Sequence, residues 1–152
     1  MMTVNTEDIS RLQRSLDDLA SAMGGDEVAS ALMAGAFVLE GEAKQNVQRM
    51  RAIDTGFLLN SIHSTSRAGS NYDKARSEAK ARNGDGEMFP ELRMGKGEAA
   101  VAAGAEYARH VEYGTVRMTA RPFMRQAVER ASGDAVDAIG EAIERKLERI
   151  FR

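Results

Sequence analysis

Two short groups of residues have types and spacing that could support catalysis. Asp54-Thr55-Gly56 has the D-T-G order of the aspartic proteases, where two carboxylates share one proton. The chain has one such triplet, so a protease of this type would need two copies of the chain. His110, Val111 and Glu112 have the H-x-E order of the zinc deaminases.

The residues around each group argue against both activities. Phe57 follows the D-T-G triplet, where the proteases have a small residue. The deaminases require cysteine ligands, and the chain has no cysteine. As a turn, D-T-G needs only an aspartate that bonds its own backbone and a glycine that permits positive φ. We therefore expect a protein that is not an enzyme and that holds no cofactor and no metal.

The segment Ala105–Phe123 has the pattern of a fixed corner. Tyr107, Ala108 and Val111 fall on one face of a short helix, which Gly114 ends in a left-handed conformation. An extended crossing over Thr115–Ala120 follows. Pro122 suits the first position of the next helix, because its missing N–H would be unpaired there.

Four arginines gather around this corner: Arg109, Arg117, Arg121 and Arg125. They could bind phosphate, but such arginines more commonly pair with carboxylates or lie in subunit interfaces. Glu106 and Glu112 are the nearest carboxylates in the sequence. We therefore expect the arginines either to pair with these two carboxylates or to lie in a subunit interface.

Long helices are predicted on both sides of the middle of the chain. Three stretches repeat apolar residues at three- and four-residue spacing: Glu7–Met23, Asp26–Met50 and Pro122–Arg152. The last is longer than the diameter of a domain of this size, so we expect its far end to pack on a neighbouring subunit.

The middle of the chain has strand and loop patterns. Phe57–Ser66 alternates as a strand does, and Met88–Met94 with Glu98–Gly104 predicts a hairpin. Ala68–Gly86 predicts a long mobile loop, with a transient helix at Asp73–Arg82. The stretch 67–97, which has seven basic and five acidic residues and hence a charge of +2, is expected to be a flexible loop and hairpin arm.

Together these patterns predict an α+β fold with a small, mostly antiparallel sheet packed against long N-terminal and C-terminal helices. Residues 1–152 are expected to form a single domain, with the helix within 1–25 loosely attached. A net charge of −2 gives no general attraction to nucleic acid or to a membrane. No apolar run reaches the roughly 18 residues of a membrane helix, and the N-terminus lacks a signal-peptide pattern.

Three blocks of sequence, in order, carry a family resemblance: DTGFLLNSI at 54–62, YARHVEYGT at 107–115 and ARPF at 120–123. They resemble the D-T-G-x-L-x-x-S-I, Y-A-x-x-V-E-x-G-T and R-P-F patterns of the phage morphogenesis proteins. These are tail-component and neck proteins, which join head to tail in long-tailed phages.

The resemblance implies a structural virion protein that forms a homo-oligomeric ring, a hexamer or another multiple, in the neck. Implied partners are the head–tail connector or stopper and the tail-tube or tail-terminator proteins, with genome DNA passing through the ring. The chain would be in the host cytoplasm during assembly and then in the virion. The matching positions are expected to be fold and interface residues: Asp54, Gly56, Tyr107, Glu112, Gly114, Thr115, Arg121, Pro122 and Phe123.

Two alternatives stay open at this point. A tail terminator, which caps the tail tube, needs the same kind of ring-forming α+β domain. A DNA-contacting module would use the basic 67–96 arm, and its binding would weaken steeply as salt rises.

Overall fold

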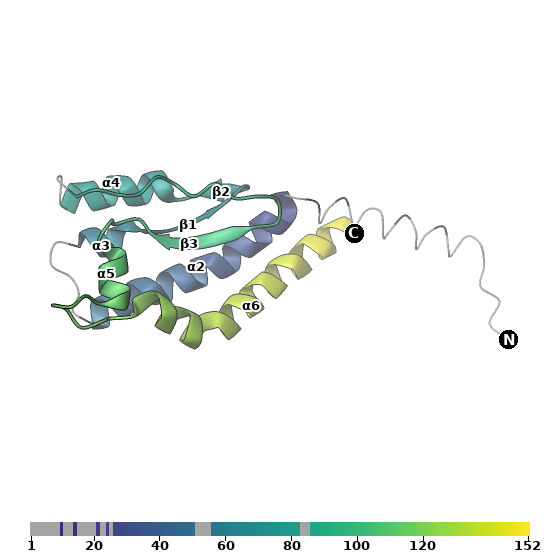
Figure 1. The fold of residues 1–152 in the computed structure, drawn as a ribbon. Coiled ribbons are helices and arrows are strands. Elements are labelled where there is room, and N and C mark those ends of the chain that lie inside the picture. Colours follow the sequence, from purple (N-terminus) through teal and green to yellow (C-terminus); the bar gives the residue numbers. More distant parts are fainter. Residues whose placement is uncertain are drawn as a thin grey trace.

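The computed structural model describes residues 26–50, 56–82 and 86–152, together with Ser10, Arg14, Ser21 and Gly24. The expected helix Glu7–Met23, apart from three single positions, and Asp54 and Thr55 lie outside the described residues. The described part is α+β, as predicted from the sequence (Figure 1). Its elements are α2 (Asp26–Arg49), α3 (Phe57–Ser61), β1 (Ile62–Ser66), β2 (Gly69–Ser70), α4 (Tyr72–Arg82), β3 (Ala99–Ala103), α5 (Ala108–Tyr113) and α6 (Phe123–Ile150).

The sheet is small and antiparallel, with the strand order β2-β1-β3. In the central strand β1 all five residues are buried, although most of them are polar. Ile62 pairs with Ala103 and Ser66 with Ala99, so β3 covers the full length of β1 and forms one edge of the sheet.

Helix α2 lies between the sheet and α6 (Figure 1). On the side toward the sheet, the Glu40 carboxylate accepts a hydrogen bond from the Ser64 hydroxyl at 2.7 Å. On the side toward α6 the helices approach closely, since a Cβ atom on Gly35 would lie 2.9 Å from the carbonyl oxygen of Ala135. Burial on both sides explains why alanine and glycine are so frequent in α2.

The prediction of one strand over Phe57–Ser66 is wrong in its first half, where the chain forms α3. Gly56, at φ +81°, precedes this helix, and the Asn60 side-chain amide donates to the Gly56 carbonyl oxygen at 2.9 Å. None of the five residues of α3 is β-branched, so little in its local preference opposes a helical turn.

The prediction of a mobile loop over Ala68–Gly86 is also wrong for the residues described there. Gly69–Ser70 pairs with β1, and Tyr72–Arg82 is helix α4. Helix α4 buries Tyr72, Ala75 and Ala79, which face α3 and the sheet. The 67–97 stretch is therefore not a flexible arm over these residues, because its few apolar side chains recur at helical spacing.

The expected hairpin of Met88–Met94 with Glu98–Gly104 forms only at its open end, where the Phe89 N–H donates to the Gly104 carbonyl oxygen at 2.8 Å. Its second half contains β3, which pairs with β1 instead. From the first half, Met88 makes one isolated bridge with Ala105, and the Glu91 carboxylate accepts a hydrogen bond from Thr65 of β1. The segment before β3 therefore crosses toward β1 instead of pairing with β3.

Helix α6 begins one residue later than predicted and runs along α2 (Figure 1). Its buried residues Phe123, Ala127, Ala131 and Ala135 lie in its first half. Near its far end Lys146 forms an ion pair with Glu27 in the first turn of α2. The far end therefore reaches the start of α2, and packing against a neighbouring subunit stays a prediction. Among the described helices, none has the length and apolar character needed to cross a bilayer.

Candidate functional site

Gly114 fixes the end of α5 in a conformation that only glycine adopts readily. Its φ is +74° and its ψ 176°, so φ is positive as expected but the backbone is not left-handed helical. Its N–H donates to the His110 carbonyl oxygen at 2.8 Å. A Cβ atom at this position would lie 2.7 Å from the Ala120 nitrogen and 2.8 Å from the Met118 oxygen, both in the backbone. The chain after α5 therefore folds tightly against Gly114.

The segment Thr115–Ala120 is a closed turn and not the extended crossing that the sequence predicted. The Thr115 N–H donates to the Met118 carbonyl oxygen at 2.8 Å, and the Met118 N–H donates to the Thr115 carbonyl oxygen at 3.3 Å. The Arg121 N–H then donates to the Val111 carbonyl oxygen of α5 at 2.7 Å. Val116, at the tip of the turn, is completely exposed. We call Thr115–Met118 the corner turn.

Glu112 caps the start of α6. Its two carboxylate oxygens accept hydrogen bonds from the backbone N–H groups of Met124, at 2.9 Å, and Arg125, at 3.0 Å. Pro122, which precedes the helix, has no side-chain group that could do this. The negative charge also lies at the positive end of the helix dipole. The sequence had suggested that Glu112 pairs with the corner arginines. Its carboxylate instead joins α5 to α6.

Replacing Glu112 with alanine is expected to lower the free energy of unfolding by about 1 kcal/mol, within the 0.5–2 kcal/mol typical of lost helix caps. Urea denaturation monitored by circular dichroism measures this change. The matched control is Glu106→Ala, since Glu106 is an exposed glutamate beside α5 whose side chain caps no described helix. Equal stability of the two variants would contradict the capping role.

Tyr107 connects the first two motif blocks. Its hydroxyl accepts a hydrogen bond from the Leu58 N–H at 3.1 Å, and its ring centroid lies 6.4 Å from that of Phe57. Phe123, from the third block, is 1% exposed and shares one core cluster with Phe57 and Val111. The first block, which is far from the other two in the sequence, therefore meets them in the folded chain.

The remaining motif positions differ in how exposed they are to solvent. Thr115 and Arg121 are exposed, Gly56 and Pro122 are half-buried, and Asp54 lies outside the described residues. Phe123 is thus a core residue. Exposed Thr115 and Arg121 can contact a partner directly.

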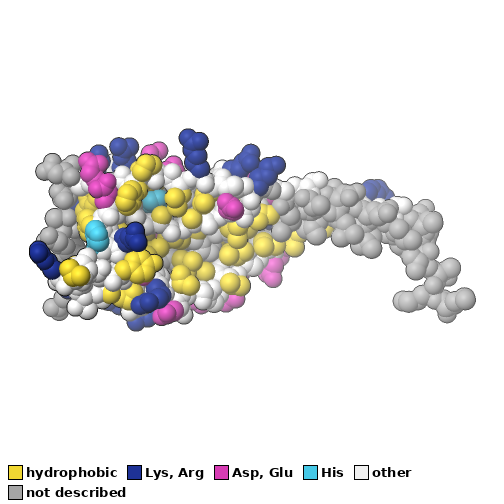
Figure 2. Space-filling view, in the orientation of Figure 1, with side chains coloured by type: hydrophobic (Ala, Val, Ile, Leu, Met, Phe, Trp, Pro, Cys, Tyr) yellow, Lys and Arg dark blue, Asp and Glu magenta, His cyan; other side chains and the backbone are white. Residues whose placement is uncertain are grey.

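A pocket of about 470 Å³ lies beside the corner turn, between the end of β3, α5 and the first turns of α6. Its lining residues are Ala103, Ala108, Arg109, Glu112, Tyr113, Phe123, Met124, Arg125 and Val128. Tyr113 and Val128 are 74% and 52% exposed, which is unusual for such side chains. Figure 2 shows hydrophobic side chains spread over this face of the molecule, with several basic side chains among them.

The corner arginines stay available to a partner. Arg109 and Arg125 line the pocket, and Arg117 lies in the corner turn. Among the described residues, the side chains of these three and of Arg121 form no ion pair. The surface therefore combines exposed apolar groups with positive charge that no described carboxylate pairs with, a combination common in protein interfaces.

The histidines do not assemble a catalytic group. His63 is buried in β1, with Nδ1 2.9 Å from the Ser61 carbonyl oxygen, whereas His110 is exposed on α5. Across residues 26–50, 56–82 and 86–152, no three His, Cys, Asp or Glu side chains are grouped so that they could hold a metal ion.

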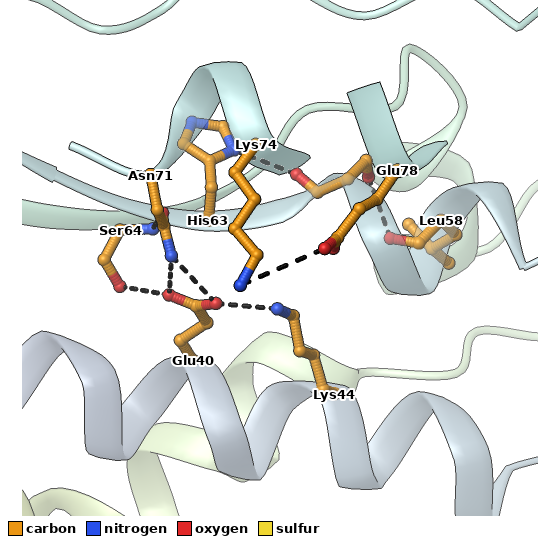
Figure 3. Close-up of polar contacts among 9 residues, drawn as sticks. Glu40, Lys44, Leu58, His63, Ser64, Asn71, Lys74 and Glu78 are labelled. Carbon is orange, nitrogen blue, oxygen red and sulfur yellow. Dashed lines mark hydrogen bonds and ion pairs between the residues drawn. The ribbon is translucent and has the colours of Figure 1, made fainter. Parts of the chain in front are cut away.

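A buried polar cluster around Glu40 was not found from the sequence (Figure 3). Glu40 is 7% exposed and accepts hydrogen bonds from Ser64 at 2.7 Å, Lys44 at 2.7 Å and Asn71 at 3.0 Å. Burial alone would raise the pKa of Glu40, but the hydrogen bonds from Lys44, Ser64 and Asn71 and the charge of Lys44 outweigh it, so the pKa is lowered. The cluster connects α2 to the sheet. Its one sequence signal is a glutamate on the sheet side of an amphipathic helix.

The fold and the corner define an α+β protein with a preformed, partly apolar surface of the kind that binds other proteins. Residues 10–114 match the model of a family described as "Bacteriophage HK97-gp10, putative tail-component", so the chain belongs to this family of phage tail components. Comparisons with curated proteins and with solved structures gave no match.

The resemblance inferred from the motif blocks is thereby confirmed. The matched range contains the first block and all of the second except its last residue, Thr115, whereas the block at 120–123 follows it. The family is a structural one, and membership makes the chain a structural component of a phage virion.

Proposed function

We propose that the chain is a neck or tail-completion protein that joins the phage head to the tail as a homo-oligomeric ring. The observation that carries this proposal is the corner turn. It holds Val116 completely exposed on backbone that is tied at both ends by hydrogen bonds. Such a preorganised apolar projection loses little conformational entropy when it binds, which favours association.

The pocket beside the corner supports a repeated contact between copies. The corner turn projects from the molecule, whereas the pocket is concave and lies between β3, α5 and α6. A contact between two different surfaces of the same chain is heterologous, and it closes into a ring when the rotation between copies divides the circle. In the virion, the ring would contact connector or stopper proteins on the head side and tail-tube proteins on the tail side.

A Val116→Asp variant tests the role of the corner turn. We expect the free energy of unfolding to change by no more than about 0.5 kcal/mol, since Val116 makes no buried contact. Virion assembly should nevertheless fail, because the charged side chain cannot be buried in an apolar contact. Complementation of a phage lacking the gene, scored by titre and by electron microscopy of unjoined heads and tails, measures the effect.

The matched control is Val136→Asp, which introduces the same charge at a 65% exposed valine on α6, away from the corner turn. Normal virions with Val116→Asp would contradict the proposal. Light scattering of the purified chain, alone and with the neighbouring neck or tail-tube protein, then gives the number of copies.

Electron microscopy of the same virions also separates the neck role from the tail-terminator role. Loss of a terminator gives tails of uncontrolled length, whereas loss of a joining protein gives separate heads and finished tails. DNA binding that weakens steeply with salt, without any assembly defect, would instead favour the DNA-contacting alternative.

A further inference from the structure

The outer edge of β3 has backbone groups that nothing described in the chain uses. Gly104 donates its N–H to the Ser61 carbonyl oxygen at 3.0 Å, which fixes the alternation of the β1–β3 ladder. Antiparallel ladders alternate between hydrogen-bonded and non-hydrogen-bonded pairs. Ala100 and Ala102 therefore bond to β1, whereas the N–H and C=O groups of Ala99, Val101 and Ala103 point away from the sheet.

The neighbouring strand agrees with this assignment. Ser64, opposite Val101, directs its own backbone toward β2, where its N–H donates to the Asn71 side chain at 2.7 Å and its carbonyl accepts from the Asn71 N–H at 3.1 Å. Ser64 and Val101 thus form a non-hydrogen-bonded pair. All five residues of β3 are partly exposed.

This edge also lacks the usual protection against pairing with another strand. Exposed edges are commonly blocked by a charged side chain, a proline or a bulge. Residues 99–103 read A-A-V-A-A, with no charge and no proline, and their pairing with β1 is regular. The side chains are small enough to let another backbone approach.

The sequence of this edge is symmetric about Val101. In an antiparallel pair of two identical β3 strands centred there, Val101 faces Val101, and Ala99 faces Ala103 of the other copy. A charged residue near the axis of such a pair would face a like charge in the other copy. The five residues of β3 avoid that conflict.

The flanking charges are complementary in the same register. Lys96 lies five positions before Val101 and Glu106 five positions after it, and both side chains are exposed. Pairing two copies about Val101 brings each Lys96 toward Glu106 of the other copy. The turn before β3 of the second copy would then lie beside Ala103, at the wall of the pocket.

We propose that a second copy of this chain binds along β3, so that two three-stranded sheets join into one sheet of six strands with two-fold symmetry. This contact is distinct from the heterologous ring contact at the corner turn. It covers the open edge in the free protein, where an uncovered edge would otherwise promote aggregation.

Cysteine cross-linking tests the register directly, since the chain has no cysteine of its own. In Val101→Cys the two Cα atoms would be about 5.5 Å apart, within the range that a disulfide spans. In the control Ala99→Cys, each cysteine would lie two residues from the axis, so the two would be offset along the strands by four residues, or about 13 Å. We expect a covalent dimer for Val101→Cys under mild oxidation and a reduced chain for Ala99→Cys.

A proline variant separates pairing from folding. The Val101 N–H is unused within its own sheet, so Val101→Pro should keep the fold, because proline is tolerated where an edge N–H faces outward. It removes the two central hydrogen bonds between copies and should raise the dimer dissociation constant at least about tenfold. Sedimentation velocity over a wide concentration range measures this constant.

The charges give a third measurement. Lys96→Glu should weaken the dimer, and the double variant Lys96→Glu with Glu106→Lys should restore it. A wild-type chain that stays monomeric at its highest soluble concentration, or a dimer unaffected by Val101→Pro, would overturn the proposal. Val116→Asp should leave the Val101→Cys cross-link intact, so the ring and the β3 contact can fail separately.

Discussion

Replacing Phe123 with alanine is expected to lower the free energy of unfolding by about 3–5 kcal/mol, the range for a phenylalanine removed from a packed core. Phe123 is 1% exposed and packs in the cluster that contains Val47, Phe57 and Val111. Its carbonyl oxygen also accepts a hydrogen bond from the Asn46 side chain at 3.0 Å. The truncated side chain would leave a cavity where α2, α5 and α6 meet.

Urea denaturation measures this loss, and we expect the dependence of the unfolding free energy on urea concentration to keep its slope. The matched control is Val128→Ala on the same helix, which is 52% exposed and should change stability by no more than about 0.5 kcal/mol. A Phe123→Ala protein as stable as the control would show that this core is not packed as described. An assembly defect of Phe123→Ala would therefore be explained by the loss of folding stability and would not show that Phe123 contacts a partner.

Replacing Glu40 with alanine is the second large expected effect. The change leaves the Ser64 hydroxyl and the Asn71 amide without their acceptor, in a site where Ser64 is fully buried. Each donor left unpaired costs about 1–3 kcal/mol. Thermal unfolding followed by circular dichroism should show a clear loss, whereas Gln45→Ala on the exposed side of α2 should not.

The same carboxylate makes the stability depend on pH. Burial opposes the charge of Glu40, but the bonds from Lys44, Ser64 and Asn71 prevail and lower its pKa from the ordinary 4.5. A lowered folded-state pKa stabilises the fold above the unfolded-state pKa, and this contribution is lost as the pH falls through the folded-state value. The stability advantage of the wild-type chain over Glu40→Gln should therefore shrink below about pH 4.5. An advantage that grows on acidification would contradict this assignment.

The helices were the most predictable part of the fold. The periodic apolar residues predicted both ends of α2, Asp26 and Arg49, and the start of α6, Phe123, to within one residue. Such patterns are read reliably because one helix face must be buried whatever it packs against. The family blocks likewise indicated phage tail components, and the family match confirms this.

The sheet was less predictable because its partners are set by distant residues. β3 follows a plausible turn at Gly95–Gly97, but it pairs with β1, more than thirty residues earlier. Helix α4 was predicted only as a transient helix at Asp73–Arg82, since Tyr72, Ala75 and Ala79 form only a narrow apolar face among charged residues. That spacing of three and four was the signal that the helix is packed and stable.

At the corner, the sequence indicated which residues matter for local shape but not what they contact. Gly114 and Pro122 predicted a helix end and a helix start from local conformational rules. The bonds from Glu112 to the α6 backbone depend on how α5 and α6 meet, which no local pattern encodes. The closed corner turn was missed for the same reason.

The close approach of α2 to α6 also bears on when the chain can fold. Gly35 lies against Ala135, one hundred residues further along the sequence. At about 5–20 residues per second, a ribosome needs roughly 5–20 s to make the chain between them. Throughout that interval one long side of α2 has no helix to cover it. We therefore expect the core to close only after α6 has left the ribosome, so that a nascent chain arrested before Phe123 would depend on chaperones.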